Sequence, residues 1–259
     1  MKRIVCFFAA LIFALMLVPR TVAGTRAQLA KRVYDSVVLL YVQGEDGGMH
    51  MLCTATAYRE LVKDKKSAGY RLASASHCVR GETSVEQKRS RYFITADSAG
   101  SKTFIPAKLI EAGDRKVGDD FSIFEVDTNA ILEVTPLGDN EKAATGDAVV
   151  SVASPLGLGK QFFAGYISCL LIDRPPLDAS SVQWNNVMLV EIGSGPGSSG
   201  SAIVSEGQEA IVGFLVGGFG GSNIGAIVLP VSKFKAFESA VDKGTYKKTK
   251  DASHEKEDE

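Results

Sequence analysis

Short runs of apolar, β-branched and aromatic residues recur along the chain, and clusters of Gly, Pro, Asp and Asn separate them. Runs of this length and composition are typical of β-strands. Because almost no helical periodicity lies between them, the pattern predicts an all-β sandwich or barrel. The predicted strands are Val33 to Val42, Tyr92 to Thr95, Phe121 to Val126, Ala148 to Val152, Phe162 to Ile172, Val187 to Ile192, Ala210 to Val216 and Ile224 to Leu229.

Three regions depart from this strand pattern. Apolar residues recur at helical spacing from Val231 to Val241, which predicts a short helix near the C-terminus. The stretch from Asp127 to Asp147 contains proline and glycine residues, so we expect it to connect two strand-rich halves of similar size. Residues 243–259 are charged and almost free of apolar side chains, which predicts a solvated, disordered tail.

The first residues have the order of a secretory signal. Lys2 and Arg3 precede an uninterrupted apolar run from Ile4 to Val18, and the small residues Ala23 and Gly24 follow. This order predicts a signal peptide over residues 1–24, cleaved after Ala23 or Gly24. An uncleaved membrane anchor is the alternative, but the run is shorter than the roughly 20 residues that span a bilayer. We therefore expect a secreted or periplasmic protein.

Composition and cysteine count narrow the function classes. Of the 259 residues, 45% are hydrophobic and 23% charged, and the net charge is −1, so no basic field would attract nucleic acid. Loss of the signal peptide would remove Cys6 and leave Cys53, Cys78 and Cys169, an odd number that allows one disulfide and one free thiol. The cysteine spacings fit no zinc site, so we expect no metal.

Ser199 lies in the glycine-rich segment Gly193 to Ser201, between two strand-like sequences. A serine hydroxyl becomes an effective nucleophile when a base accepts its proton and when N–H groups stabilise the oxyanion. Glycines let the segment turn tightly, so the N–H groups of Gly197 and Ser199 can point into one hollow. A flexible linker is the alternative interpretation, and the apolar sequence on each side argues against it.

The same segment also contains the pattern G-x-G-x-x-G, from Gly195 to Gly200. In dinucleotide-binding proteins these glycines open a helix of a βαβ unit. Here the next residues, Ser201 to Val204, have the sequence of a strand, and Glu206 and Gly207 follow as a turn. We therefore expect no nucleotide cofactor.

Three histidines are candidates for the general base. His254 lies in the charged tail and His50 in a glycine-rich stretch, whereas His77 ends an apolar-rich run. A lone histidine in such a run is more often a buried core residue than a catalyst. A serine hydrolase requires a positioned base, however, and elimination favours His77.

A buried carboxylate should orient this histidine. Asp119 and Asp120 both precede the strand that begins at Phe121, and the alternation of the strand does not decide between them. Either choice gives the chain order His, Asp, Ser, which is that of chymotrypsin-type enzymes and not of α/β-hydrolases.

Five segments together make the sequence resemble the trypsin-like serine peptidases, especially their HtrA (Deg) branch, over most of residues 33–236. Each segment is similar to a family motif, and the five occur in the family's order. They are Ser74 to Cys78 (S-A-S-H-C, resembling T-A-A-H-C), Asp120 to Phe124 (D-F-S-I-F, resembling D-L-A-L-L), Ser154 to Gly159 with Ala164 to Ser168, Pro196 to Ile203 (P-G-S-S-G-S-A-I, resembling P-G-N-S-G-G-P-L), and Asn223 to Pro230.

This resemblance implies two packed six-stranded antiparallel β-barrels with a short C-terminal helix. It implies a peptidase domain over 25–242, with barrel 1 at about 33–130, barrel 2 at about 143–230 and the helix at about 231–241. It assigns His77 as base, Asp120 and not Asp119 as the orienting carboxylate, and Ser199 as nucleophile. The N–H groups of Gly197 and Ser199 become the oxyanion hole.

The resemblance also implies a disulfide and a substrate-binding strand. Animal trypsin-like enzymes join the residue after the histidine to a cysteine on the preceding strand, which implies a Cys53–Cys78 disulfide; two buried free thiols are the alternative. Residues 211–217 are expected to pair with the substrate as an added strand. The expected substrate-binding residues are Gly193, Phe214, Leu215, Val216 and Gly217. The expected pocket wall contains no acidic residue, which favours a small or medium apolar P1 residue. Its members are Gly193, Val216, Gly217 and Gly225 or Ala226.

The sequence departs from the family pattern near the nucleophile. Ser201 replaces a glycine, Ala202 replaces a proline, and Ser198 stands where many animal enzymes carry an aspartate that pairs with a freed N-terminus. No R-I-V-G-G activation site is present and no PDZ-sized segment follows residue 242, so we expect neither zymogen cleavage nor regulation by such a module.

The sequence thus predicts an exported serine endopeptidase that cleaves exported or unfolded polypeptides through an acyl-enzyme, without cofactor, metal or nucleic acid. The departures at Ser201 and Ala202 motivate one alternative, a catalytically silent trypsin-fold binding protein. A non-peptidase serine hydrolase on the same scaffold is the other.

Overall fold

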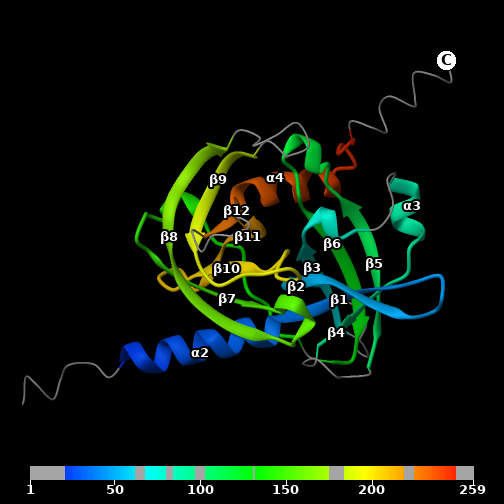
Figure 1. Cartoon of the computed structure of the whole chain (residues 1–259), viewed down its shortest axis with the longest axis horizontal. Coiled ribbons are helices and arrows are strands. Elements are labelled where there is room, and N and C mark those ends of the chain that lie inside the picture. The colour runs from blue at the N-terminus through cyan, green and yellow to red at the C-terminus, as the bar shows by residue number, and fades with distance from the viewer. Residues whose placement is uncertain are drawn as a thin grey trace, which may run out of the picture.

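Two closed six-stranded barrels form the body of the chain (Figure 1). The computed structural model describes residues 21–61, 68–79, 84–96, 103–130, 132–174, 184–218 and 225–248. All strand pairs within each barrel are antiparallel. The double barrel and the C-terminal helix that the sequence predicts are both confirmed.

The first barrel closes in the order β1-β2-β3-β6-β5-β4. Three of its strands, β2, β3 and β5, were not among the predicted runs. Their sequences mix polar and small residues with apolar ones, and β5 alternates exposed Pro106 and Lys108 with buried Ala107 and Leu109. The strands are β1 (Val37–Gln43), β2 (Met49–Leu61), β3 (Ala68–Ser74), β4 (Tyr92–Thr95), β5 (Ile105–Ala112) and β6 (Ser122–Thr128).

The second barrel closes in the order β10-β11-β12-β9-β8-β7. Its core consists mainly of β-branched and other aliphatic side chains, as expected for strands buried on one face. The strands are β7 (Ala148–Ala153), β8 (Gln161–Arg174), β9 (Trp184–Glu191), β10 (Ala202–Ser205), β11 (Ala210–Gly218) and β12 (Ala226–Pro230).

The N-terminal part of the first predicted strand is helical instead. Helix α2 (Thr21–Ser36) ends where β1 begins, so residues 33–36 belong to the helix and barrel 1 begins at Val37. The helix buries Leu29, Val33 and Ser36, which lie on one face at spacings of four and three residues. This helical periodicity overrides the β-branched composition that suggested a strand. A second helix absent from the prediction is α3 (Ser84–Arg89).

Ion pairs hold α2 against the second barrel, along which it runs in Figure 1. Arg26 pairs with Glu206 and Arg32 with Glu209, both in the turn between β10 and β11. The predicted signal peptide lies largely outside the described residues, which begin at Thr21. Within the described part of the chain, no helix is both long and apolar enough to cross a membrane.

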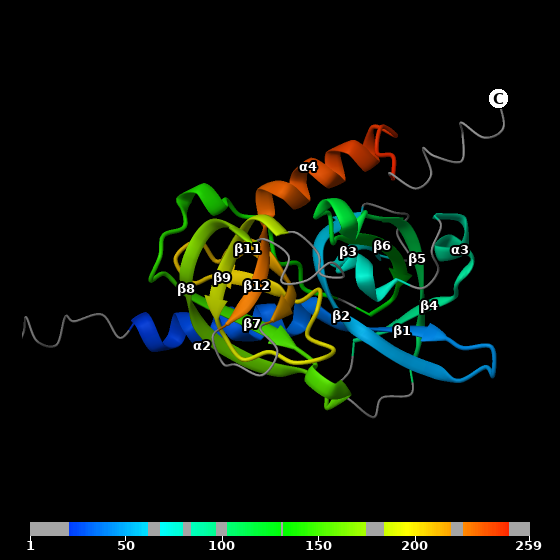
Figure 2. The ribbon, with the colours of Figure 1, turned by 45° about the horizontal axis from the view of Figure 1, so that its top comes forward.

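Helix α4 (Val231–Asp242) follows β12 and crosses over both barrels (Figure 2). Its Phe234 and Phe237 pack against Phe121 of the first barrel, and Phe234 also packs against Phe214 of the second. Phe121 and Phe214 contact each other edge to face, with ring centroids 6.2 Å apart. This aromatic cluster therefore joins both barrels and the helix, and it includes the residue directly after Asp120.

A buried carboxylate fixes α4 to the first barrel. Glu238 is 5% exposed and accepts hydrogen bonds from Tyr58 Oη at 2.8 Å, Arg59 at 2.9 Å and Arg71 at 3.3 Å. Arg71 also binds Asp242 at 2.7 Å, one turn further along the helix. These contacts connect β2 and β3 of the first barrel to α4, which packs over both barrels.

We expect Glu238→Ala to lower the free energy of unfolding by about 3 kcal/mol, because it leaves the buried Tyr58 hydroxyl without its acceptor and removes the buried carboxylate that Arg59 and Arg71 share. Glu209→Ala is the matched control, since it removes an ion pair whose two side chains are each 47% exposed. That change should cost about 0.5 kcal/mol. Urea denaturation of both variants measures the difference, and equal costs would contradict this assignment.

The segment after α4 also differs from the prediction of a disordered tail from residue 243. Tyr246 packs edge to face on Phe237, with ring centroids 4.8 Å apart, and Lys248 is 7% exposed. Residues 243–248 therefore belong to the folded domain. Residues 249–259 lie outside the described part of the chain.

Candidate active site

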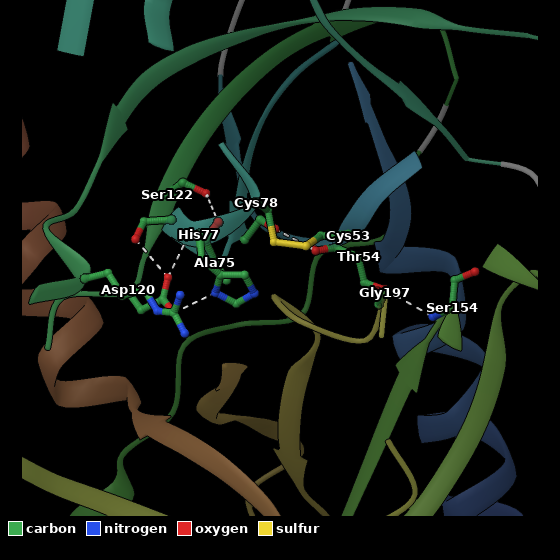
Figure 3. The surroundings of a disulfide bond; sticks show 12 residues. Cys53, Thr54, Ala75, His77, Cys78, Asp120, Ser122, Ser154 and Gly197 are labelled. Atoms are coloured by element: carbon green, nitrogen blue, oxygen red, sulfur yellow. Dashed lines mark hydrogen bonds and ion pairs between the residues drawn. A yellow bond between two sulfur atoms is a disulfide. The ribbon is translucent and has the colours of Figure 1, made fainter. Parts of the chain in front are cut away.

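His77 and Asp120 form a hydrogen-bonded pair at the edge of the first barrel (Figure 3). His77 lies in a 3-10 helix, Ser76–Cys78, directly after β3, and Asp120 lies two residues before β6. The imidazole Nδ1 is 2.6 Å from Asp120 Oδ2. The His77 side chain is 24% exposed and that of Asp120 wholly buried, so the ring has one nitrogen on a buried carboxylate and keeps partial access to solvent.

Three donors hold the Asp120 carboxylate. Besides the imidazole, its Oδ1 accepts the His77 backbone N–H and the Ser76 hydroxyl, each at 2.8 Å. Burial by itself would raise the pKa of Asp120, but the hydrogen bonds and charge of His77 and the bond from Ser76 lower it below its usual value. The ionised form therefore stabilises the fold above the ordinary Asp pKa, and this contribution is lost as pH falls through the lowered pKa.

The neighbouring Asp119, which the strand pattern alone could not exclude, has a different environment. It is partly exposed, and its Oδ2 lies 3.5 Å from Tyr246 Oη. Burial raises the pKa of this carboxyl. The structure thus brings Asp120, and not Asp119, onto His77.

The loop that carries Ser199 is fixed to strand β2 of the opposite barrel. The Ser199 carbonyl accepts the Thr54 N–H at 3.1 Å, and the Gly197 carbonyl accepts the Thr54 hydroxyl at 2.8 Å. Thr54 Oγ1 in turn accepts the Ser154 N–H at 3.1 Å. One threonine therefore contacts both ends of the Gly197–Ser199 tripeptide and the loop after β7.

The Cys53–Cys78 disulfide joins β2 to the histidine, as the resemblance implied. The two Cα atoms are 6.0 Å apart, and Cys169 is a free thiol. Cys53 directly precedes Thr54, and Cys78 directly follows His77. A continuous covalent and hydrogen-bonded path therefore runs from the backbone of Ser199 through Thr54 and the disulfide to His77. Figure 3 shows the part of this path from Thr54 through Cys53 and Cys78 to His77.

The peptide between Pro196 and Gly197 has a defined orientation. The Pro196 carbonyl accepts the Leu156 N–H at 2.6 Å. Because C=O and N–H point in opposite directions across a trans peptide, the Gly197 N–H points away from the Leu156 loop. Gly197 has a φ of +95°, which favours glycine. Among the described residues, the N–H groups of Gly197 and Ser199 have no acceptor within the protein.

Gly200 leaves no room for a side chain directly after Ser199. A Cβ there would lie 2.3 Å from the Thr54 carbonyl and from Ser74 Oγ, and its φ is +84°. The Gly200 N–H also donates to the Leu215 carbonyl at 2.7 Å. This glycine therefore lets the loop approach both β2 and the strand that leads to His77.

We expect Gly200→Ala to lower kcat by roughly 100-fold, because the Cβ would displace the neighbouring serine from the residues that position it. Gly146→Ala is the matched control: its φ is +93°, but no atom lies within 4 Å of the added Cβ. Both variants carry left-handed strain of about 1–2 kcal/mol. Steady-state kinetics beside thermal melting separates the two effects, and the same kcat in both variants would rule out the positional role.

The three departures from the family pattern are accommodated in this loop. Ser198 Oγ accepts the Gly195 N–H at 3.2 Å, so its side chain stabilises the turn from Gly195 to Ser198. The Ala202 N–H donates to Thr56 Oγ1 at 3.2 Å, a bond that a proline could not make. Ser201 is fully buried, and its hydroxyl has no partner among the described residues. Two of the three substituted positions therefore make hydrogen bonds within or beside the loop.

Two of the expected substrate contacts are instead core or support residues. The ring of Phe214 is 1% exposed and belongs to the aromatic cluster, and the side chain of Leu215 is 3% exposed. The Leu215 N–H donates to the Ser201 carbonyl at 2.9 Å, so its backbone binds the nucleophile loop. Val216 is also buried, and Gly217 is partly exposed. A substrate strand could therefore use β11 only beyond Leu215.

A pocket of about 390 Å³ opens beside the loop. Gly193 and Gly225 line it, as expected. Glu191 was missed because it stands in no family motif, and Tyr166 was not assigned to the substrate although it stands in the segment from Ala164 to Ser168. Because Glu191 carries a carboxylate, the expectation that no acidic residue lines the pocket is wrong. The lining residues are Ala164, Gly165, Tyr166, Glu191, Ile192, Gly193, Ser194 and Gly225.

One group of potential metal ligands occurs in the part of the chain that the structure describes. Ligand atoms of Cys53, His77 and Cys78 lie within 4.8 Å of one another. The disulfide engages both sulfur atoms, so the group cannot serve as a thiolate site while that bond is intact.

Comparison with known proteins agrees with this geometry. The sequence model of a trypsin-like peptidase domain matches residues 61–214, more than half of the chain. No curated protein sequence matches. A solved structure of the HtrA-type protease AlgW with a tripeptide has a TM-score of 0.62 at 17% identity, covering 84% of this chain and 64% of that one. AlgW with a decapeptide gives 0.63 at 16%, covering 85% and 68%.

Proposed function

Because the chain belongs to the trypsin-like peptidase domain family, we propose that it is a serine endopeptidase with Ser199 as nucleophile, His77 as general base and Asp120 as the orienting carboxylate. The observation that carries the proposal is the buried Asp120–His77 pair, joined by a disulfide and Thr54 to the glycine-rich loop of Ser199.

In the proposed mechanism, His77 Nε2 takes the proton of Ser199 Oγ as the oxygen attacks the peptide carbonyl. Asp120 holds Nδ1–H and stabilises the imidazolium that forms. The same proton then passes from Nε2 to the leaving amine, and an acyl-enzyme ester remains on Ser199. Water, deprotonated by the neutral imidazole, hydrolyses this ester and regenerates the serine.

The N–H groups of Gly197 and Ser199 supply the proposed oxyanion hole. Donors that are fixed before the reaction stabilise developing negative charge without reorganisation. The orientation of the Pro196–Gly197 peptide supports this role, as do the two N–H groups, for which the described residues offer no acceptor. The proposal therefore describes a site whose donors are in place before substrate binds.

We infer that the substrates are polypeptides. The chain spans about 64% of the length of the AlgW structure with a tripeptide, and similarity at this identity supports the fold and not the natural substrate. An extended peptide could add to the edge of β11 beyond Leu215. The disulfide supports an oxidising compartment, in agreement with the proposed export.

Hydrolysis of casein and of a short peptide ester tests the reaction class. A serine endopeptidase cleaves both, a non-peptidase hydrolase only the ester, and a silent binding protein neither. Ser199→Ala should abolish both activities, and Ser232→Ala, on the exposed start of α4, should leave both unchanged. Casein cleavage that survives Ser199→Ala would contradict the proposal.

A further inference from the structure

The loop that carries Asp120 is closed at its base. It runs from Gly113 to Asp120 between β5 and β6, and the Gly113 N–H donates to the Phe121 carbonyl at 2.7 Å. The Asp119 N–H donates to the Asp114 carbonyl at 3.1 Å. The backbones of Asp114 and Asp119 therefore meet at the base of the loop, directly before Asp120.

A segment from the far end of the chain contacts this base. After α4 the chain turns at Gly244, which has a φ of +66°, and Tyr246 reaches the Asp120 loop. Tyr246 Oη accepts the Asp114 N–H at 2.8 Å and lies 3.5 Å from Asp119 Oδ2. One hydroxyl thus contacts both residues that close the loop.

The ring of Tyr246 supports the same region from a second side. It packs edge to face on Phe237, and Phe237 stacks on Phe121 with centroids 6.0 Å apart. Phe121 directly follows Asp120 and is fully buried. Further along, the buried Lys248 donates to Gln87 of α3. We call residues 246–248 the C-terminal strap.

We propose that Tyr246 is a positioning residue for Asp120 and that the C-terminal strap sets the geometry of the catalytic carboxylate. The inference rests on the proposed function of Asp120. Removing the hydroxyl leaves the Asp114 N–H without its acceptor and ends the contact with Asp119 Oδ2, so the base of the loop shifts and Asp120 Oδ2 moves relative to the imidazole. Burial raises the pKa of Tyr246, which keeps its hydroxyl protonated and able to donate toward Asp119.

The test compares hydroxyl deletions at two adjacent positions in the full chain. Tyr246→Phe removes the contact with the Asp120 loop, whereas Thr245→Val removes a hydroxyl bond of 3.2 Å to the Ala240 carbonyl in α4. We expect Tyr246→Phe to lower kcat roughly 10-fold, and truncation after Gly244 roughly 100-fold, with KM changed by less than about twofold. Thr245→Val should leave kcat unchanged.

A spectroscopic readout separates positioning from loss of stability. The His77 Nδ1 proton, bonded to Asp120, should give a low-field proton resonance that Tyr246→Phe shifts or broadens and Thr245→Val does not. An unchanged resonance in Tyr246→Phe, or a kcat loss equal to its loss of folded protein, would overturn the inference. Because the resonance needs no turnover, it tests the strap even if wild type proves inactive, which would instead defeat the proposed function.

Discussion

Ser199→Ala should lower kcat for peptide hydrolysis by about a million-fold, because the hydroxyl forms the covalent intermediate and no neighbouring group replaces it. Ser198, the adjacent hydroxyl, is fully buried and accepts the Gly195 N–H, so it cannot take over the role. The measurement is the steady-state kinetics of a fluorogenic peptide, with circular dichroism showing that the fold is retained.

Members of a triad act as one unit, which provides a stringent control for this prediction. His77→Ala should cost about as much as Ser199→Ala, and the double variant should be little worse than either one. If the kcat losses of the two single variants multiplied in the double variant, the two residues would not act in the same step, which would contradict the proposed mechanism.

Asp120→Asn should lower kcat by about ten-thousand-fold, since the amide keeps the shape of the carboxylate but stabilises the wrong imidazole tautomer. The buried carboxylate accepts three hydrogen bonds, and an amide nitrogen cannot accept the one from His77 or Ser76 that faces it.

Asp119→Asn is the comparison for this change, because it alters the adjacent carboxyl without touching His77. Its loss in kcat should be far smaller than that of Asp120→Asn. A larger loss in kcat from Asp119→Asn than from Asp120→Asn would contradict the assignment of Asp120 as the orienting carboxylate. Both variants can be assayed at neutral pH, well above the ordinary Asp pKa.

Much of the fold could be predicted from the sequence because β-branched runs and turn residues are local signals. The predicted strand Tyr92 to Thr95 coincides with β4, and the helix from Val231 differs from α4 by one residue at its end. The local strand pattern missed β2, on which the resemblance had placed Cys53, because its buried threonines, Thr54 and Thr56, look polar in sequence. They are buried because their hydroxyls bond the nucleophile loop.

The site could be predicted only in part, because some roles depend on long-range contacts. The resemblance of the segment from Asp120 to Phe124 to a family motif singled out Asp120, and the structure shows hydrogen bonds from Ser76 and His77 to Asp120 and none of these to Asp119. Phe214 and Leu215 were expected at the substrate but lie in the core, since burial of a strand residue depends on what packs against it. No local pattern reveals that Tyr246 reaches a loop more than a hundred residues earlier in the chain.

The most direct test of the central claim is covalent labelling by a fluorophosphonate, which reacts with an activated serine hydroxyl. Intact-mass and peptide mass spectrometry of the labelled protein would identify the modified residue. The account predicts one label per chain, on Ser199, that is lost in Ser199→Ala and in His77→Ala and retained in Ser232→Ala. A folded wild-type protein that takes up no label, or a label on another serine, would contradict it.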